Sequence, residues 1–327
     1  MRAFEFLSEK NNELSDQELR TQIIVAVNQA DRQLLDKFYH VLDAGDIDEK
    51  LSAMLSGEEI DKDAARIKDD LVNFFLTIKG STKEKKEFVD QFSKGFIDVT
   101  ELLKPESSID RWFTGNSFAK KMFEQVAIRI RPQGIGPGEY ALAAFSPLLK
   151  STGLIGGGGD LLYGEGDSAI KIELKGKVSK WGRMHDPKKM DYDIRSIKTA
   201  FQEAGVDSPT LTVVQWLQMR KNFDGKTVNS LSKTTVDNLF KHVDDASKAP
   251  LIQSLSTGGL EQIKSDWGKL SVVNYAAATK FSGILFYDVP SGKTNYVSDP
   301  SGVNFTSDAP QMYGPERDAM PKTQIKI

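Results

Sequence analysis

The stretch LIGGGGDLLYGEGDSAIKIELKGK, residues 154–177, decides the fold that this sequence predicts. Its apolar runs DLLYG and SAIKIELKG have the length and composition of strands, and the GEGD segment between them is typical of a hairpin turn. Because side chains alternate across a strand, Glu173 and Lys175 point to one face, opposite to their apolar neighbours. The hairpin brings Asp160, at the start of the first strand, close to Glu173.

Two carboxylates placed in this way would bind a hard divalent cation, Mg²⁺ or Mn²⁺. Such an ion activates water and neutralises the charge that develops on a phosphate ester. Three roles are open to Lys175, namely orienting the attacking water, acting as a general base, and stabilising the developing charge. The sequence leaves the choice among these roles open.

The composition excludes several other kinds of site. The chain has 327 residues, of which 39% are hydrophobic, a proportion normal for packed globular domains. Cysteine is absent, which excludes disulfides, thiolate zinc sites and cysteine nucleophiles. The three histidines, His40, His185 and His242, have no metal-ligand spacing, so any metal here should be held by carboxylates.

The N-terminal third reads as an acidic helical domain, residues 1–104. Three segments with helical periodicity, 14–45, 58–80 and 81–104, predict its helices, and the third opens with a capping-box spacing from Ser81 to Glu84. Residues 1–110 contain 15 Lys and Arg against 24 Asp and Glu, whereas residues 111–220 contain 16 against 11. The first third should repel nucleic acid and the middle third should attract it.

After Pro105 the sequence changes to short apolar runs separated by glycine-rich turns. GPGE at 136–139 predicts a loop that enters a short helix, with Glu139 in its first turn. A second hairpin is predicted over 281–299, and helical segments lie between the two hairpins. We therefore expect an α+β or α/β fold over residues 105–300, followed by an irregular tail, 301–327.

Basic residues crowd the segment that follows the Glu173 and Lys175 pair. Such a patch would contact phosphates without reading the base sequence, and Trp181 and Tyr192 would stack on unpaired bases. The alternative is an ordinary solvated loop. The residues that we expect to bind nucleic acid are Lys177, Lys180, Arg183, Lys188 and Lys189.

These motifs together resemble the PD-(D/E)XK nucleases, the restriction-endonuclease-like superfamily. The matching residues are GPGE at 136–139, GGD at 158–160, IELKG at 172–176 and GR at 182–183, although Gly159 stands where the family often has proline. The resemblance implies a restriction-endonuclease-like core over residues 105–300, with a central mixed β-sheet flanked by helices. The activity that it implies is that of a Mg²⁺-dependent endo- or exodeoxyribonuclease. It also implies a catalytic set of Glu139, Asp160, Glu173 and Lys175, in which the three carboxylates bind the metal.

Two other functions remain open from the sequence. One is a nuclease-like fold without catalysis, such as a structural or assembly protein of a tailed phage, which the opening MRAFEFL resembles. The other is a nucleic-acid binder that uses only the basic patch. We expect DNA as partner, no membrane span, and a location in the host cytoplasm or a virion. A protein partner of the N-terminal helices and self-association remain open.

Overall fold

The computed structural model describes most of the chain from residue 60 onward, together with a short helical segment before it. The described residues are 32–38, 40, 60–113, 115–130, 136–152, 159–176, 181–183, 190–300, 306–307, 310–314 and 324–326. The prediction of a helix over 14–45 lies outside them except for 32–38 and 40, which are helical.

The first half of the chain supplies mainly helices. The predicted capping box is confirmed, because the Ser81 side chain accepts from the Glu84 N–H while the Glu84 carboxylate accepts from the Ser81 N–H. The elements are α4 (Ile60–Thr77), α5 (Thr82–Gln91), the 3₁₀ helix η1 (Phe92–Lys94), α6 (Val99–Leu102), α7 (Ile109–Trp112), α8 (Ser117–Arg129) and α9 (Pro137–Phe145).

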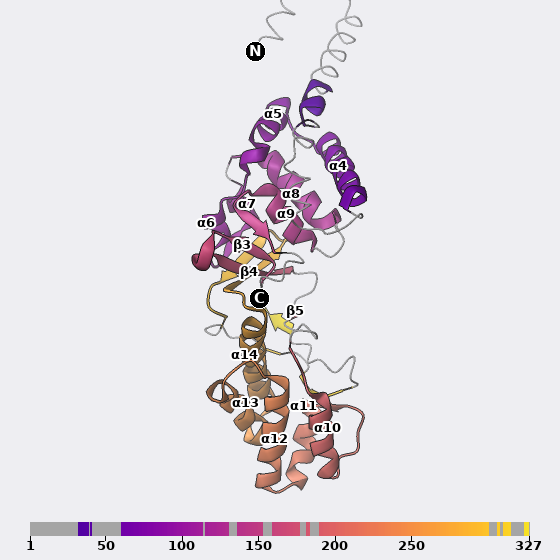
Figure 1. The fold of residues 1–327 in the computed structure, drawn as a ribbon, viewed down its shortest axis with the longest axis vertical. Coiled ribbons are helices and arrows are strands. Elements are labelled where there is room, and N and C mark those ends of the chain that lie inside the picture. Colours follow the sequence, from indigo (N-terminus) through magenta and orange to yellow (C-terminus); the bar gives the residue numbers. More distant parts are fainter. Residues whose placement is uncertain are drawn as a thin grey trace, which may run out of the picture.

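A six-stranded mixed sheet with the order β1-β8-β7-β4-β3-β2 lies across the middle of the molecule (Figure 1). Both predicted hairpins are confirmed, since β3 pairs antiparallel with β4 and β7 pairs antiparallel with β8. The central pair, β4 and β7, is parallel. The strands are β1 (Ser107–Ser108), β2 (Leu149–Ser151), β3 (Leu161–Tyr163), β4 (Ile170–Gly176), β7 (Gly283–Asp288) and β8 (Lys293–Val297), and the β3–β4 turn contains the 3₁₀ helix η3 (Gly166–Ser168).

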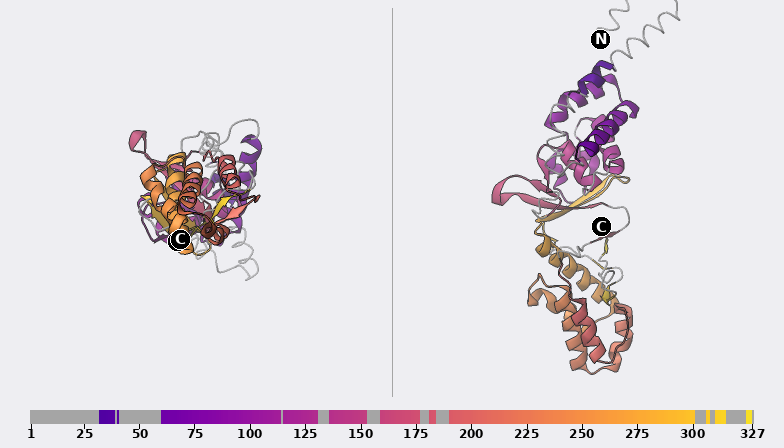
Figure 2. Two further views of the ribbon diagram at one scale, coloured as in Figure 1. Left: turned by 90° about the horizontal axis from the view of Figure 1, so that it is seen from below. Right: turned by 45° about the vertical axis from the view of Figure 1, so that its right-hand side comes forward.

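A parallel pair needs a crossover, and here the crossover from β4 to β7 is a helical bundle with its own core. Trp216, Trp267 and Phe201 lie at the centre of that core and are fully buried. The helix α14 leads from this bundle back to the sheet (Figure 2). The bundle comprises α10 (Ile194–Glu203), α11 (Val213–Met219), η4 (Arg220–Asn222), α12 (Gly225–Leu239), α13 (Asp245–Thr257) and α14 (Leu260–Thr279).

The two faces of the sheet are covered by different helices. Ile172 and Leu285 belong to a core formed with α8 and α9, and we call this side the α9 face. Ile284 and Phe286 pack instead with Tyr275 of α14, on the side that we call the α14 face. The expected mixed sheet flanked by helices is therefore present.

The described N-terminal helices share a hydrophobic core with later elements of the chain. We expected the acidic segment 1–104 to form a core of its own, but Phe75 of α4 and Phe88 of α5 belong to the same hydrophobic core as α8, α9 and the sheet. Phe88 is stacked on Phe96 at 5.0 Å and lies 5.3 Å from Phe118, measured between ring centroids. The apolar side of these helices therefore packs against α8, which lies between them and the sheet.

The tail is also more regular than its composition suggests. The segment 301–327 contains β9 (Gln311–Tyr313), which pairs with β6 (Leu211–Thr212), and β10 (Gln324–Lys326), which pairs with β5 (Trp181–Arg183). Tyr313 is buried in the core of the helical bundle, so part of the expected irregular tail belongs to the packed fold. No helix in the described ranges is long and apolar enough to cross a membrane.

Candidate active site

The β3–β4 hairpin positions Asp160 at the open end of the strand pair. Leu161 pairs with Ile172, and the Asp160 N–H donates to the Ile172 carbonyl at 2.8 Å. Gly159 precedes it with φ of +70°, and a Cβ at this position would lie 3.1 Å from the Ile172 carbonyl oxygen. Both the dihedral angle and the close contact favour glycine at position 159. This explains why Gly159 stands where the PD-(D/E)XK motif often has proline.

The Asp160 carboxylate is held against the next strand, where it is partly buried. Its Oδ2 accepts a hydrogen bond of 2.7 Å from the Leu174 N–H. Burial and the negative charge of Glu173 raise the pKa of Asp160 to about 7, although the Leu174 N–H and Lys175 act in the opposite direction. A bound cation would offset the repulsion between the Asp160 and Glu173 carboxylates in this poorly solvated place.

Glu173 and Lys175 share the α14 face, as strand alternation predicts. The Lys175 Nζ lies 2.5 Å from Glu173 Oε1, and the Glu173 residue is only 5% exposed. Ile172 belongs to the core on the opposite face. This buried pair differs from an exposed salt bridge at a strand edge. Removing both charges from water costs free energy that the contacts of the pair must offset.

Sequence reasoning missed a third member of this group, Tyr275 on α14. Its hydroxyl donates to Glu173 Oε1 at 2.8 Å, and the Lys175 Nζ lies 5.2 Å from the centroid of its ring. One oxygen of Glu173 thus accepts from two donors, which leaves Oε2 for another ligand. The sequence gives no signal for this role, because Tyr275 is simply one residue of a helical segment that lies 102 positions away from Glu173.

Glu139 comes to the site from α9, in the first turn of the helix as predicted. It is only 8% exposed, and the Ser151 hydroxyl of β2 donates to its Oε1. Its negative charge contributes to the raised pKa of Asp160, so the two carboxylates are close enough to interact. Glu139 therefore reaches Asp160 from the side of the sheet opposite to Glu173.

A second tyrosine, Tyr287 of β7, lies beside these carboxylates and was also missed. Gly176 pairs with Tyr287 across the parallel strands. A Cβ at Gly138 would lie 1.7 Å from the Tyr287 hydroxyl, which explains the second glycine of the GPGE motif. Burial and the charges of Asp160 and Glu139 raise the pKa of Tyr287 to about 12, so this phenol stays protonated at neutral pH.

The predicted metal site remains a prediction from the sequence. Within the described ranges, no group of three or more His, Asp or Glu side chains lies close enough together to hold a metal ion. Asp160 and Glu173 supply a pair, and their oxygens Oδ1 and Oε2 make none of the hydrogen bonds described above. The assignment of Asp160, Glu173 and Glu139 as metal ligands stays a prediction.

The predicted nucleic-acid contacts fall mainly outside the described part of the chain. This applies to Lys177, Lys180, Lys188 and Lys189. Arg183 is the last residue of β5, which pairs with β10, and its side chain lies outside the described atoms. The basic patch therefore remains a prediction from the sequence.

Comparisons of the chain with family models, curated proteins and solved structures found no match. The resemblance to the PD-(D/E)XK nucleases therefore rests on the sequence motifs alone.

Replacing Tyr275 by phenylalanine should test how the Glu173 and Lys175 pair is held. The change removes a hydrogen bond to a buried carboxylate, so the free energy of unfolding should fall by about 1.5–3 kcal/mol in urea titrations at pH 7. Tyr163→Phe on β3 is the matched control, because the hydroxyl of this partly buried tyrosine makes no hydrogen bond within the described structure. Equal stability of the two variants would contradict the assigned role of Tyr275.

Proposed function

We propose that this protein hydrolyses DNA phosphodiester bonds with the aid of Mg²⁺ or Mn²⁺. The observation that carries the proposal is the β3–β4 hairpin, which gathers Asp160, Glu173 and Lys175 at one end of a buried sheet. A third carboxylate, Glu139, reaches Asp160 from α9. Buried carboxylates and a lysine that converge without a histidine or cysteine favour hard-cation chemistry over other hydrolytic mechanisms.

The order of the elements supports the family resemblance. In the PD-(D/E)XK family the site consists of a Glu on the first core helix, an Asp at the start of a strand and a carboxylate-x-lysine pair on the next strand. The corresponding residues here are Glu139 on α9, Asp160 directly before β3, and Glu173 with Lys175 on β4. We propose on this basis that the mixed sheet and its flanking helices form a restriction-endonuclease-like core.

The donor atoms suit a hard divalent cation. Asp160 and Glu173 each have one oxygen held by protein donors, which orients the other oxygen for a ligand. A bound Mg²⁺ would supply an activated water and neutralise charge on the phosphate. The two residues would hold that ion, and Glu139 would add a third carboxylate after a small side-chain movement.

Lys175 is best suited to the stabilisation of negative charge. Its Nζ lies 2.5 Å from Glu173 Oε1 and 5.2 Å from the centroid of the Tyr275 ring, and both partners attract a cation. A charged lysine beside the metal ligands would donate to a phosphate oxygen or orient the attacking water. We therefore favour these two roles over the general-base role that the sequence left open.

The test is a cleavage assay with plasmid and linear single-stranded DNA in Mg²⁺, Mn²⁺ or EDTA. The parent should cut only with a divalent cation, and Glu173→Gln should reduce the rate at least about 100-fold, because a lost metal ligand removes several kcal/mol of transition-state stabilisation. Glu165→Gln is the control: Glu165 lies at the turn of the same hairpin, is exposed and pairs with Lys150.

The assay also separates the competing functions. If the parent cuts no DNA or RNA with any divalent cation, or if Glu173→Gln cuts as fast as the parent, the catalytic proposal is wrong. DNA binding that persists in EDTA without cleavage would then support a binding module that uses the basic patch.

A further inference from the structure

The α14 face continues from Lys175 as a row of side chains across three strands. Lys175 of β4 pairs with Phe286 of β7, and Phe286 pairs with Asn295 of β8. Paired residues in neighbouring strands project to the same face, so Asn295 shares a face with Glu173 and Lys175. At about 4.8 Å per strand, Asn295 lies roughly 10 Å from Lys175 across the sheet.

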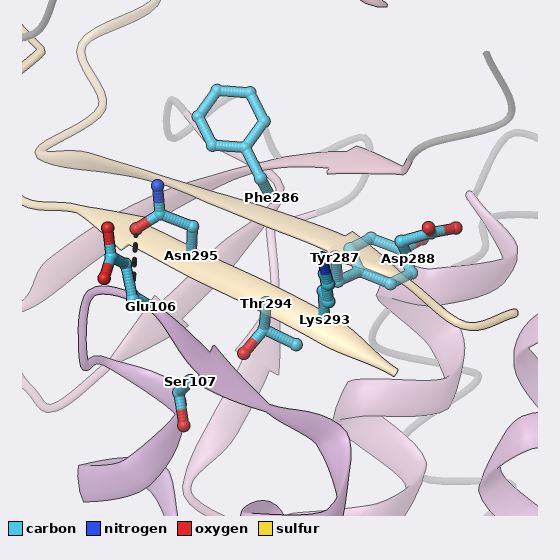
Figure 3. Close-up of a pocket in the computed structure, with 8 residues that line it drawn as sticks. All are labelled: Glu106, Ser107, Phe286, Tyr287, Asp288, Lys293, Thr294 and Asn295. Atoms are coloured by element: carbon cyan, nitrogen blue, oxygen red, sulfur yellow. Dashed lines mark hydrogen bonds between the residues drawn. The ribbon is translucent and has the colours of Figure 1, made fainter. Parts of the chain in front are cut away.

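A pocket of about 450 Å³ opens where this row reaches β7 and β8 (Figure 3). This volume lies within the range of small-molecule sites. A second pocket, of about 500 Å³, shares Glu106 and Asn295 with it and extends the hollow past β8. The first pocket is lined by Glu106, Ser107, Phe286, Tyr287, Asp288, Lys293, Thr294 and Asn295.

A backbone hydrogen bond holds one of the polar side chains that line the pocket, Asn295. The Glu106 N–H donates to Asn295 Oδ1 at 3.2 Å, as Figure 3 shows, and Glu106 has a φ of +50°, which is rare for a residue with a side chain. With Oδ1 engaged, the Asn295 amide presents its N–H₂ donor. Within the described ranges, neither the Glu106 carboxylate nor the Lys293 ammonium forms an ion pair.

The charges of the lining disfavour a phosphate. Glu106 and Asp288 bring two carboxylates against the single ammonium of Lys293. A carboxylate accepts well from an exocyclic amine such as cytosine N4, and an asparagine amide complements the edge of a base. The pocket thus suits a nucleobase better than a phosphate.

We propose that this pocket holds one unpaired nucleobase with an exocyclic amine, cytosine or adenine, next to the phosphate at the candidate active site. The inference rests on the proposed function for its position beside the scissile bond. Its preference for an amine-bearing base rests on the pocket alone.

Binding of free nucleosides tests the pocket without any cleavage. In EDTA, ligand-detected NMR titrations of the full-length protein should show that 2′-deoxycytidine binds about tenfold more tightly than thymidine, which corresponds to about 1.4 kcal/mol. Inorganic phosphate should not compete. Glu106→Gln replaces the carboxylate that would accept from the exocyclic amine, so it should reduce the difference between the nucleosides. Asn295→Asp keeps the acceptor for the Glu106 N–H but loses the amide donor, so both nucleosides should bind more weakly.

The controls make the outcomes distinguishable. Glu165→Gln should bind both nucleosides as the parent does, and thermal unfolding of each variant checks that it is folded. If the parent binds neither nucleoside or binds both equally, or if the full preference persists in Glu106→Gln, the pocket assignment is wrong. Cleavage of DNA together with any of these results would refute the pocket alone, whereas selective nucleoside binding without cleavage would refute the nuclease proposal alone.

Discussion

Replacing Asp160 by asparagine should stabilise the folded protein above pH 7 and abolish the DNA cleavage that we propose. The pKa of Asp160 is raised from 3.8 to about 7 by burial and by Glu173. Between these pH values the folded parent binds a proton that the unfolded chain has released, so the stability of the parent falls as the pH rises. Asparagine carries no charge and still offers an oxygen to the Leu174 N–H. The stability of the variant should therefore not fall with rising pH at this site.

The expected gain is at most about 4 kcal/mol at pH 8, and it should vanish below about pH 4, where both states of the parent are protonated. Urea titrations in EDTA at pH 4, 6 and 8 measure it. Asp69→Asn, an exposed change on α4, is the control and should show no such dependence. A less stable Asp160→Asn at pH 8 would show that the carboxylate is not destabilised by its surroundings.

Adding Mg²⁺ tests whether Asp160 is a cation ligand or only a carboxylate that its surroundings destabilise. At pH 8 the ion should raise the unfolding temperature of the parent, because a ligand that binds only the folded state stabilises it, and it should have little effect on Asp160→Asn. DNA binding by the variant should persist or become tighter, since a negative charge near the phosphates is removed. Equal stabilisation of both proteins by Mg²⁺ would place the cation elsewhere.

The local parts of the site could be predicted from the sequence because they depend on short-range geometry. Alternation along β4 fixes the shared face of Glu173 and Lys175, and the hairpin brings Asp160 to their end. The helix start at GPGE places Glu139 in a first turn. Each of these inferences needs only the periodicity of one element or the turn between two neighbours.

The remaining parts depend on which elements meet, which periodicity does not specify. Tyr275 reaches Glu173 only because α14 returns from the helical bundle to the sheet. In the same way, the apolar positions of α5 predict a buried face for Phe88 but not its partner. The acidic composition of residues 1–104 favoured a separate domain, whereas packing against α8 and α9 buries more apolar surface.

The largest effect on stability is expected from Phe88→Ala. Phe88 is fully buried, and its ring lies between 5.0 and 6.3 Å from those of Phe38, Phe75, Phe92, Phe96, Phe118 and Phe145, measured between centroids. Removing the ring loses its burial and leaves a cavity, which together should lower the free energy of unfolding by about 3–5 kcal/mol. Leu76→Ala on α4, where the residue is 49% exposed, should change it by less than about 0.5 kcal/mol.

Hydrogen exchange in Phe88→Ala tests whether the N-terminal helices and the candidate site share one cooperative unit. The Leu174 N–H of β4 donates to the Asp160 carboxylate, and Phe88 belongs to the same core as residues of β4. The variant should therefore lose protection at the Leu174 amide, and a chain that lacks residues 1–104 should fail to fold, because Phe118 and Phe145 would lose their cover. Unchanged protection at Leu174, or a folded truncation that still cuts DNA, would show that the acidic helices are an independent domain.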